Sequence, residues 1–334
     1  MKFGAVPIDE ADGAILAHAV RIDGLVLKKG DVVTSDRRKR LADAGVESVL
    51  AARLEGDDIG EDDAAARLAA RLAGRNVRCA APFTGRVNLF AEAAGLALFD
   101  RDAIDRVNAV DEAITVATLP AFRAVEDGDM VATVKIIPFA TREATLAAAL
   151  DALGSSRAVA VAPFRPLRVG VVSTVLPGLK ESVIAKTLRA LEARLAPTGA
   201  RLVEPVAVPH DAGALTGALE RLEPESDVLV VFGASAITDR RDVIPAAIEA
   251  FGGRIERFGM PVDPGNLLLL AARGEKPIIG APGCARSPKE NGFDWVLQRV
   301  LAGVPVAGAD IRAMGVGGLL MEIASRPQPR EPHA

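Results

Sequence analysis

The spacing of hydrophobic residues divides the chain into segments, with changes of pattern near Val77 and Leu167. After residue 167, short apolar runs alternate with longer segments whose apolar residues recur at the spacing of an amphipathic helix. The runs LRVGVVST and DVLVVFG are almost continuously apolar, which is typical of parallel strands covered on both faces. This alternation predicts an α/β domain with a doubly wound, mostly parallel sheet over residues 166–305.

The expected elements of this domain follow one another in a regular order. Strands are expected within residues 167–174, 201–209, 227–233 and 276–283, and helices within 180–199, 211–223, from 243, and within 293–303. Asp211 stands where a helix N-cap is expected. Open parallel sheets bind ligands outside the carboxyl ends of their strands, so the loops that follow these strands are the expected location of a site.

The part of the chain before residue 166 shows other patterns. Residues 1–76 predict a small α/β unit, in which Ser35 caps a helix that Gly45 ends. The acidic stretch EGDDIGEDD favours the N-terminus of the next helix, and a cation site is the weaker hypothesis. Residues 77–160 carry short β-branched or alternating runs separated by Gly, Asp and Pro, which predicts a β-rich subdomain. Residues 306–334 are expected to form a C-terminal tail.

The composition is that of a soluble globular protein. Half of the 334 residues are hydrophobic and 25% are charged, and the net charge of −4 gives no indication of a basic surface for nucleic acid. Asp9, Glu10 and Asp12 do not fit a signal peptide, and no apolar run reaches the roughly 18 residues of a membrane span. Cys79 and Cys284 are isolated and the three histidines lie far apart, so we expect a reducing cytoplasm and no His-rich metal site.

Three loops at the expected carboxyl ends of strands combine small, polar and charged residues: STVLPG, GASAITDRRD and GAPGCARSPKE. Small residues let backbone amides approach an anion closely, and Arg and Lys add charge and hydrogen bonds to phosphate. A carboxylate pair together with phosphate oxygens can hold Mg²⁺. The loops therefore predict a phosphorylated, polar ligand other than nucleic acid; the alternative is that they are ordinary polar turns. No GxxxxGK[ST] or GxGxxG motif occurs.

The segment FGASAITDRRDVIP resembles the signature of the molybdopterin-binding domain that molybdopterin adenylyltransferases and molybdenum insertases share. VSTVLPG, VPHDAGAL, MPVDPGN and GAPGCARSP resemble further stretches of that family in the same order, so the resemblance covers about residues 167–304. The first segment, from DEADGAILAHAV to VESVLAARL, resembles the N-terminal pattern of the insertases. The tail DIRAMGVGGLLMEIASRPQPRE resembles the ending of a bacterial subfamily, some of whose members continue into a nucleotidyltransferase domain.

The resemblance implies a molybdopterin-binding fold and a site. Asp242 and Asp239 would be the catalytic residues and Mg²⁺ ligands, with ATP as a further substrate. Molybdopterin would be bound by ten residues of the three loops: Ser173, Thr174, Gly233, Ser235, Thr238, Arg241, Gly283, Arg286, Ser287 and Lys289. The resemblance also implies a homo-oligomer, with a molybdenum enzyme or a nucleotidyltransferase as a protein partner and without membrane or nucleic-acid partners.

Two functional hypotheses follow, and a third is that the domain has lost the ligand and serves only for interaction. The first is an enzyme of molybdenum cofactor biosynthesis, acting by adenylyl transfer to molybdopterin or by molybdate insertion. The second is a molybdopterin carrier or sensor that serves a molybdenum enzyme without turnover. Phe232 and Val175 stand at glycine positions of the family, and His210 replaces an aspartate. The altered glycines favour the carrier, because bulky residues there would crowd a phosphate unless Phe232 faces the core.

Overall fold

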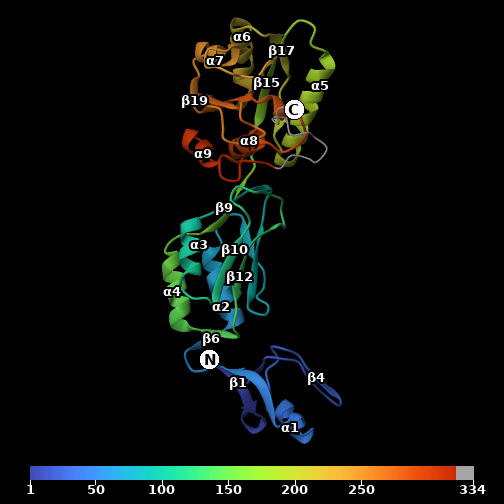
Figure 1. Cartoon of the computed structure of the whole chain (residues 1–334), viewed down its shortest axis with the longest axis vertical. Helices are drawn as coiled ribbons and strands as arrows, with labels where there is room; N and C mark the ends of the chain where they lie inside the picture. The colour runs from blue at the N-terminus through green and yellow to red at the C-terminus, as the bar shows by residue number, and fades with distance from the viewer. Residues whose placement is uncertain (321–334) are drawn as a thin grey trace, which may run out of the picture. The chain divides into compact units, whose positions relative to one another are not determined.

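The structure, a computed structural model, describes residues 1–320 and divides the chain into two units (Figure 1). The first unit contains residues 1–93 and 97–162, and the second contains residues 94–96 together with those from 163 onward. Among the described residues, no helix is long and apolar enough to cross a membrane. Part of the expected tail over 306–334 lies outside the described residues.

The first unit begins with a small antiparallel sheet, a hairpin and one helix. These elements are β1 (Lys2–Pro7), β2 (Ile15–Leu16), β3 (Val20–Ile22), β4 (Leu25–Leu27), α1 (Ser35–Asp43) and β5 (Ser48–Arg53). β5 lies between β1 and β2, and β3 pairs with β4. The N-cap of α1 is Thr34 and not Ser35, because the Thr34 Oγ1 accepts the Arg37 amide at 3.4 Å. The expected cap was therefore wrong by one residue.

The segment from residue 58 to 163 combines strands with three helices. Its elements are β6 (Asp58–Gly60), α2 (Glu61–Leu72), β7 (Val77–Cys79), β8 (Arg86–Ala91), β9 (Gly95–Phe99), α3 (Arg101–Asn108), β10 (Ile114–Thr118), β11 (Ala124–Val125), β12 (Met130–Ile136), β13 (Ala140–Arg142), α4 (Glu143–Leu153) and β14 (Val159–Pro163). The sheets have the orders β10-β12-β8-β7, β11-β9-β14 and β13-β6. The strands within residues 85–100, 113–119 and 130–139 were expected, but α3 and α4 were not. α3 begins at Asp100, whose Oδ1 accepts the Ala103 amide at 3.0 Å, and it buries Ile104 and Val107.

The second unit is built on one seven-stranded sheet of order β16-β15-β18-β21-β20-β19, with β17 paired to β15. Its main elements are β15 (Arg168–Val175), α5 (Glu181–Leu195), β16 (Arg201–Leu202), β17 (Val206–Pro209), α6 (Ala212–Leu222), β18 (Val228–Phe232), α7 (Val243–Ala250), β19 (Arg254–Phe258), β20 (Leu269–Arg273), β21 (Lys276–Ala281), α8 (Gly292–Ala302) and α9 (Gly308–Ala313). β16, β17, β15, β18 and β21 pair in parallel, whereas β20 and β19 add an antiparallel edge. The predicted mostly parallel α/β fold is confirmed, and the antiparallel edge was not predicted.

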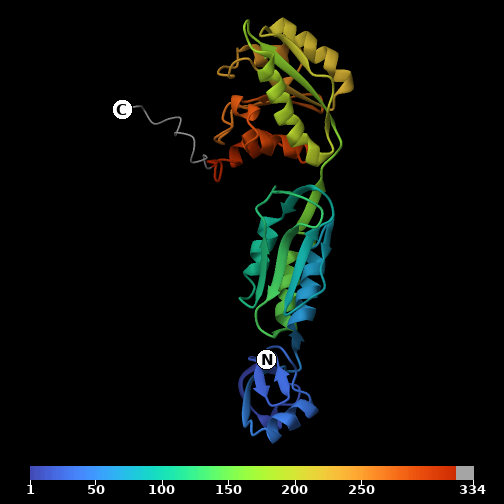
Figure 2. The same cartoon turned by 90° about the vertical axis from the view of Figure 1, so that its right-hand side faces the viewer.

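Both faces of this sheet are covered by helices (Figures 1 and 2), and β18 shows why its sequence is continuously apolar. Val228, Val230 and Phe232 pack into a core with residues of α5 and α8. Leu229 and Val231 pack into a second core with residues of α6 and α7. Because successive side chains of a strand point to opposite faces, both sets must be apolar.

An ion pair joins the starts of β15 and β18. The Asp227 Oδ2 accepts the Arg168 backbone amide at 2.8 Å, and its Oδ1 accepts the Arg168 Nη2 at 2.9 Å. The hydrogen bonds from the Arg168 side chain and backbone lower the pKa of Asp227 from 3.8 to about 2. Since the folded-state pKa is depressed, the pair stabilises the fold above pH 4, and this stabilisation is lost as the pH falls through 2.

We expect Asp227→Asn to lower the free energy of unfolding at pH 7 by about 1 kcal/mol, a value reduced for solvent screening because the pair is partly exposed. The difference from the wild-type protein should shrink between pH 4 and pH 2, where Asp227 itself becomes protonated. Urea unfolding between pH 7 and pH 2 measures this difference in the free energy of unfolding. Glu220→Gln, on the exposed side of α6, is the control. A difference that is the same at pH 5 and pH 2 would contradict the assignment.

Candidate functional site

The three loops singled out in the sequence leave one edge of the second unit's sheet. β15, β18 and β21 are parallel neighbours, and residues at or near their carboxyl ends pair in register, Ser173 with Phe232 and Phe232 with Ala281. Their carboxyl ends therefore lie side by side, and the loops 176–180, 233–242 and 282–291 begin at this edge. These loops form the candidate site, at the edge where open parallel sheets bind ligands.

The loop after β18 starts at Gly233, a position that requires glycine. A Cβ atom there would lie 2.7 Å from the Ile244 Cδ1 and 2.7 Å from the backbone oxygen of Ser235. The preceding residue, Phe232, does not crowd the loop. It is 1% exposed, and its ring centroid lies 6.2 Å from that of Phe293 in the core. Of the two orientations considered for Phe232, the structure has the one that faces the core.

The same loop presents backbone amides that have no acceptor in the described part of the chain. The Ala234 amide donates to the Thr174 Oγ1 at 2.9 Å, and the Thr238 amide donates to the Asp242 Oδ2 at 3.3 Å. Between them, the amides of the three residues 235–237 donate to no described protein acceptor. Ser235 and Ala236 are exposed whereas Ile237 is buried, so an anion from solvent can reach the first part of this row.

Arg286, in the loop after β21, connects two of the loops. Its Nη2 donates to the Gly233 carbonyl at 2.8 Å, and its Nη1 donates to the Thr187 Oγ1 on α5 at 2.8 Å. The guanidinium carbon lies 5.4 Å from the centre of the Phe232 ring. Burial lowers the pKa of this guanidinium. Arg286 therefore places positive charge directly behind the Gly233 loop.

Arg194 of α5 holds the loop after β21 in its conformation. The Arg194 Nε donates to the Asp294 Oδ1 at 2.6 Å, and both side chains are about nine-tenths buried. The two terminal nitrogens of Arg194 donate to backbone carbonyls of the loop, at Ala285 (3.0 Å), Ser287 (2.6 Å) and Lys289 (3.2 Å). The loop thus keeps one shape, in which Gly283 and Lys289 are exposed. Sequence reasoning missed Arg194, which lies within an ordinary helical pattern.

The two aspartates predicted to be catalytic are both engaged by protein donors. The Asp239 Oδ1 accepts the Arg241 backbone amide at 2.9 Å and the Arg241 Nε at 2.8 Å, and these hydrogen bonds lower the pKa of Asp239. The Asp242 Oδ1 accepts the Val243 amide at 2.7 Å and caps α7, while its Oδ2 accepts the Thr238 amide. The described residues contain no cluster of three or more potential metal ligands of the His, Cys, Asp and Glu types.

His210, which the sequence analysis treated only as a departure from the family, lies at the site. It follows β17, which pairs in parallel with β15, and so it comes to the same edge. Its Nδ1 lies 2.8 Å from the Thr174 Oγ1, and its Nε2 lies 3.3 Å from the Ser235 Oγ. Thr174 is fully buried and Ser173 nearly so. The place of His210 at the end of a predicted parallel strand was the signal that could have identified it.

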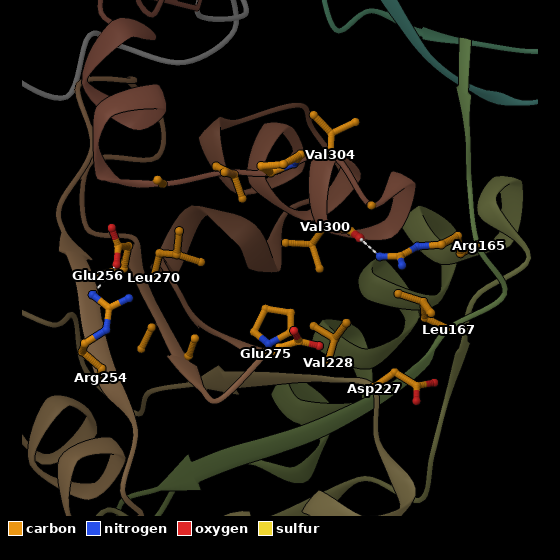
Figure 3. A pocket seen from close by; sticks show the side chains of 17 residues that line it. Arg165, Leu167, Asp227, Val228, Arg254, Glu256, Leu270, Glu275, Val300 and Val304 are labelled. Atoms are coloured by element: carbon orange, nitrogen blue, oxygen red, sulfur yellow. Dashed lines mark hydrogen bonds and ion pairs between the residues drawn. The ribbon is translucent and has the colours of Figure 1, made fainter. Parts of the chain in front are cut away.

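A cavity of about 660 Å³ lies at the opposite edge, where the parallel strands begin (Figure 3). Most of its charged side chains have partners. Figure 3 shows the Arg165 guanidinium directed at Val300, whose carbonyl it contacts at 3.1 Å, and Arg254 beside Glu256, at 2.5 Å. Asp227 belongs to the ion pair with Arg168 described above. The carboxyl edge, with its unpaired amides, is therefore the stronger candidate for an anion site.

Residues 168–307 match the family model of the probable molybdopterin binding domain. Two similar solved structures are the molybdopterin biosynthesis enzyme MoaB from Thermus thermophilus, with 17% identity, and a molybdopterin biosynthesis MoeA protein from Pyrococcus horikoshii, with 18% identity. The match to MoaB covers 42% of this chain and 98% of the MoaB chain. The match to the MoeA protein covers 91% of this chain and 76% of the MoeA chain, and both matches have a TM-score of 0.31. No curated protein sequence matches significantly. Residues 168–307 of the second unit therefore form a domain that matches the family of probable molybdopterin binding domains.

Proposed function

We propose that the second unit binds molybdopterin at the carboxyl edge of its sheet, with the phosphate on the Gly233 loop, and that the protein acts in molybdenum cofactor biosynthesis. The observation that carries this proposal is the row of unpaired amides at residues 235–237, backed by the Arg286 guanidinium. Successive backbone amides without protein acceptors can donate to an anion without a charged side chain in direct contact. The match of residues 168–307 to the molybdopterin-binding family supports the choice of a pterin phosphate.

Each loop has a separate part in this binding. The Gly233 loop supplies amides and the Ser235 hydroxyl. The loop after β21 supplies Lys289, an exposed cation that attracts the phosphate within the Debye length of about 8 Å at physiological salt. Arg194 keeps that loop in place by holding its carbonyls. The binding energy would therefore come from positioned donors together with a modest long-range attraction.

The enzymatic form of the proposal is adenylyl transfer to molybdopterin or molybdate insertion. It assigns Asp242 and Asp239 to a Mg²⁺ ion that would also bind phosphate oxygens. The contacts of this structure do not fit a preformed magnesium site. Asp239 is turned to Arg241, and both oxygens of Asp242 accept backbone amides. Turnover at this site would require these carboxylates to exchange their protein donors for a metal.

A second candidate function is a carrier or sensor that binds molybdopterin without turnover. The specific observation that favours it is the same engagement of the two carboxylates by protein donors. The Gly233 loop and the loop after β21, which together form the proposed anion cradle, would then bind the phosphate while neither aspartate is available to a metal. His210, where the family has an aspartate, adds an imidazole to this cradle. A molybdenum enzyme that receives the cofactor would then be the partner, and a homo-oligomer could present several such cradles.

The test is the ligand content of the full chain after gentle purification, measured by mass spectrometry, followed by incubation with molybdopterin, ATP and Mg²⁺ or with molybdate. We expect the wild-type protein to bind molybdopterin and Ser235→Leu to lose it, because the added side chain fills the space before the amides. Ser155→Leu, at an exposed position of the first unit, is the matched control. Binding without product identifies the carrier, and binding with product identifies the enzyme.

If the protein is an enzyme, Asp242→Asn should lower turnover at least about tenfold while lowering stability by only about 1 kcal/mol, because the Asn oxygen keeps the cap of α7 but the Asn NH2 group cannot accept the Thr238 amide. No molybdopterin binding by the wild-type protein, or equal binding by Ser235→Leu, would refute the proposed function.

A further inference from the structure

A closed ring of hydrogen bonds connects the Gly233 loop with the ends of β15 and β17. The Ala234 amide donates to the Thr174 Oγ1 at 2.9 Å. The Thr174 Oγ1 lies 2.8 Å from the His210 Nδ1, and the His210 Nε2 lies 3.3 Å from the Ser235 Oγ. Ser235 follows Ala234 directly, so the ring returns to the loop where it began. The backbone of His210 is also fixed, because its amide donates to the Val175 carbonyl at 2.9 Å.

The burial of Thr174 sets the direction of these hydrogen bonds. Its side chain is 0% exposed, and its hydroxyl proton therefore needs a protein acceptor. The Ala234 amide is a donor, so the acceptor that the described contacts offer is the His210 Nδ1. A neutral imidazole that accepts at Nδ1 carries its proton at Nε2. The Nε2–H then donates to the Ser235 Oγ, and the Ser235 hydroxyl proton is left to point away from His210.

We propose that His210 is a positioning residue that commits the Ser235 hydroxyl to donate a hydrogen bond to an oxygen of an anionic ligand, phosphate or a phosphomonoester. This inference rests on the proposed function for the identity of the ligand, but the direction of the ring does not depend on it. Because the Ser235 oxygen already accepts from His210, its proton is available to the ligand next to the unpaired amides.

The ring also determines what the cradle rejects. The Ser235 hydroxyl proton and the neighbouring amides are donors, so this part of the site favours a deprotonated phosphate oxygen over a metal ion. The carboxylate nearest in sequence, Asp211, is turned away, since its Oδ1 accepts the Ala214 amide at 2.9 Å and caps α6. An imidazole at this position therefore directs a donor to the Ser235 oxygen, where a carboxylate would have presented an acceptor.

The first experiment determines the tautomer of His210 in the full chain by long-range ¹H–¹⁵N NMR, at a pH where the ring carbon protons show a neutral imidazole. The chain has only three histidines, and His210→Gln identifies the signal. The expected result is the Nε2–H tautomer in the wild-type protein and in Thr174→Ser, which keeps the hydroxyl. Thr174→Val, which removes it at nearly the same volume, should shift the ring toward a mixture of tautomers. An Nδ1–H tautomer in the wild-type protein would overturn the inference.

The second experiment measures the binding of inorganic phosphate by calorimetry. His210→Ala should weaken it about tenfold, the loss expected for one hydrogen bond to a charged group. His210→Gln carries an amide nitrogen near the position of Nε2 and should restore affinity to within about threefold of the wild-type value. Equal affinity of the wild-type protein and His210→Ala would overturn the proposal. If phosphate binding follows this pattern but molybdopterin does not bind, the proposed function is contradicted, whereas the inferred role of His210 is retained.

Discussion

Replacing Arg194 with alanine should destabilise the second unit by about 3–5 kcal/mol and abolish ligand binding at the loop after β21. The reason is that the substitution leaves the Asp294 carboxylate buried without its cation and removes the donor to carbonyls of the loop at Ala285, Ser287 and Lys289. A buried charge that loses its partner costs far more than an exposed one. Arg194→Lys should recover part of the stability and little of the binding, because one ammonium cannot reach all of these acceptors.

Urea unfolding of the full chain and molybdopterin retention measure the two effects of the Arg194 substitution. Arg189, exposed on the same helix, provides the control, and its replacement by alanine should change neither quantity appreciably. If Arg194→Ala lowered stability but retained the ligand at wild-type affinity, the loop after β21 would not be part of the binding site.

Gly233→Ala should weaken ligand binding more than tenfold and cost about 1–3 kcal/mol of stability, the usual penalty for an added group in a tightly packed position. The new Cβ would lie 2.7 Å from the Ser235 backbone oxygen, which can recede only if the loop itself moves. Such a movement would displace the amides proposed to hold the phosphate. The new Cβ would also lie 2.7 Å from the Ile244 Cδ1, which belongs to a buried side chain.

Gly217→Ala is the matched control for this substitution. Gly217 lies in α6, outside the loops of the proposed site, and a Cβ there would have no atom within 4 Å. We therefore expect the Gly217→Ala protein to bind as the wild-type protein does and to be no less stable. Calorimetric titration with molybdopterin or inorganic phosphate compares the two variants. Equal affinities of Gly233→Ala and the wild-type protein would show that the phosphate binds elsewhere.

The sequence predicted those parts of the fold that depend on local patterns. The continuous apolar run at residues 228–232 could be assigned to a central strand because both faces of that strand are buried. Asp211 was correctly expected to cap a helix, since its Oδ1 accepts the Ala214 amide. The strand predicted over 201–209 is divided into β16 and β17, which flank Pro205 and both pair with β15.

Features that depend on distant contacts could not be predicted. β19 has no fully buried residue in its pattern, so this outermost strand gave no strong apolar signal. β20 is apolar and begins with three buried residues, but its antiparallel direction is set by its pairing with β21. The direction of the Phe232 ring depends on which face of the sheet each residue of β18 meets, and sequence alone left both orientations open. The loops expected to carry the site do lie at one edge, but the role of His210 follows from the register between β17 and β15, which no local motif records.

The alternation in β18 has a consequence for how this domain can tolerate change. Its five residues form one continuous apolar run in the sequence, yet they pack into two separate cores, one on each face of the sheet. A change of volume at Val230 can be compensated only by residues such as Phe293 on one face, and a change at Val231 only by residues such as Ile244 on the other. The effects of substitutions at adjacent positions of this strand on stability should therefore be independent of each other. Substitutions whose effects depend on each other should instead involve residues that are far apart in the chain but pack on the same face.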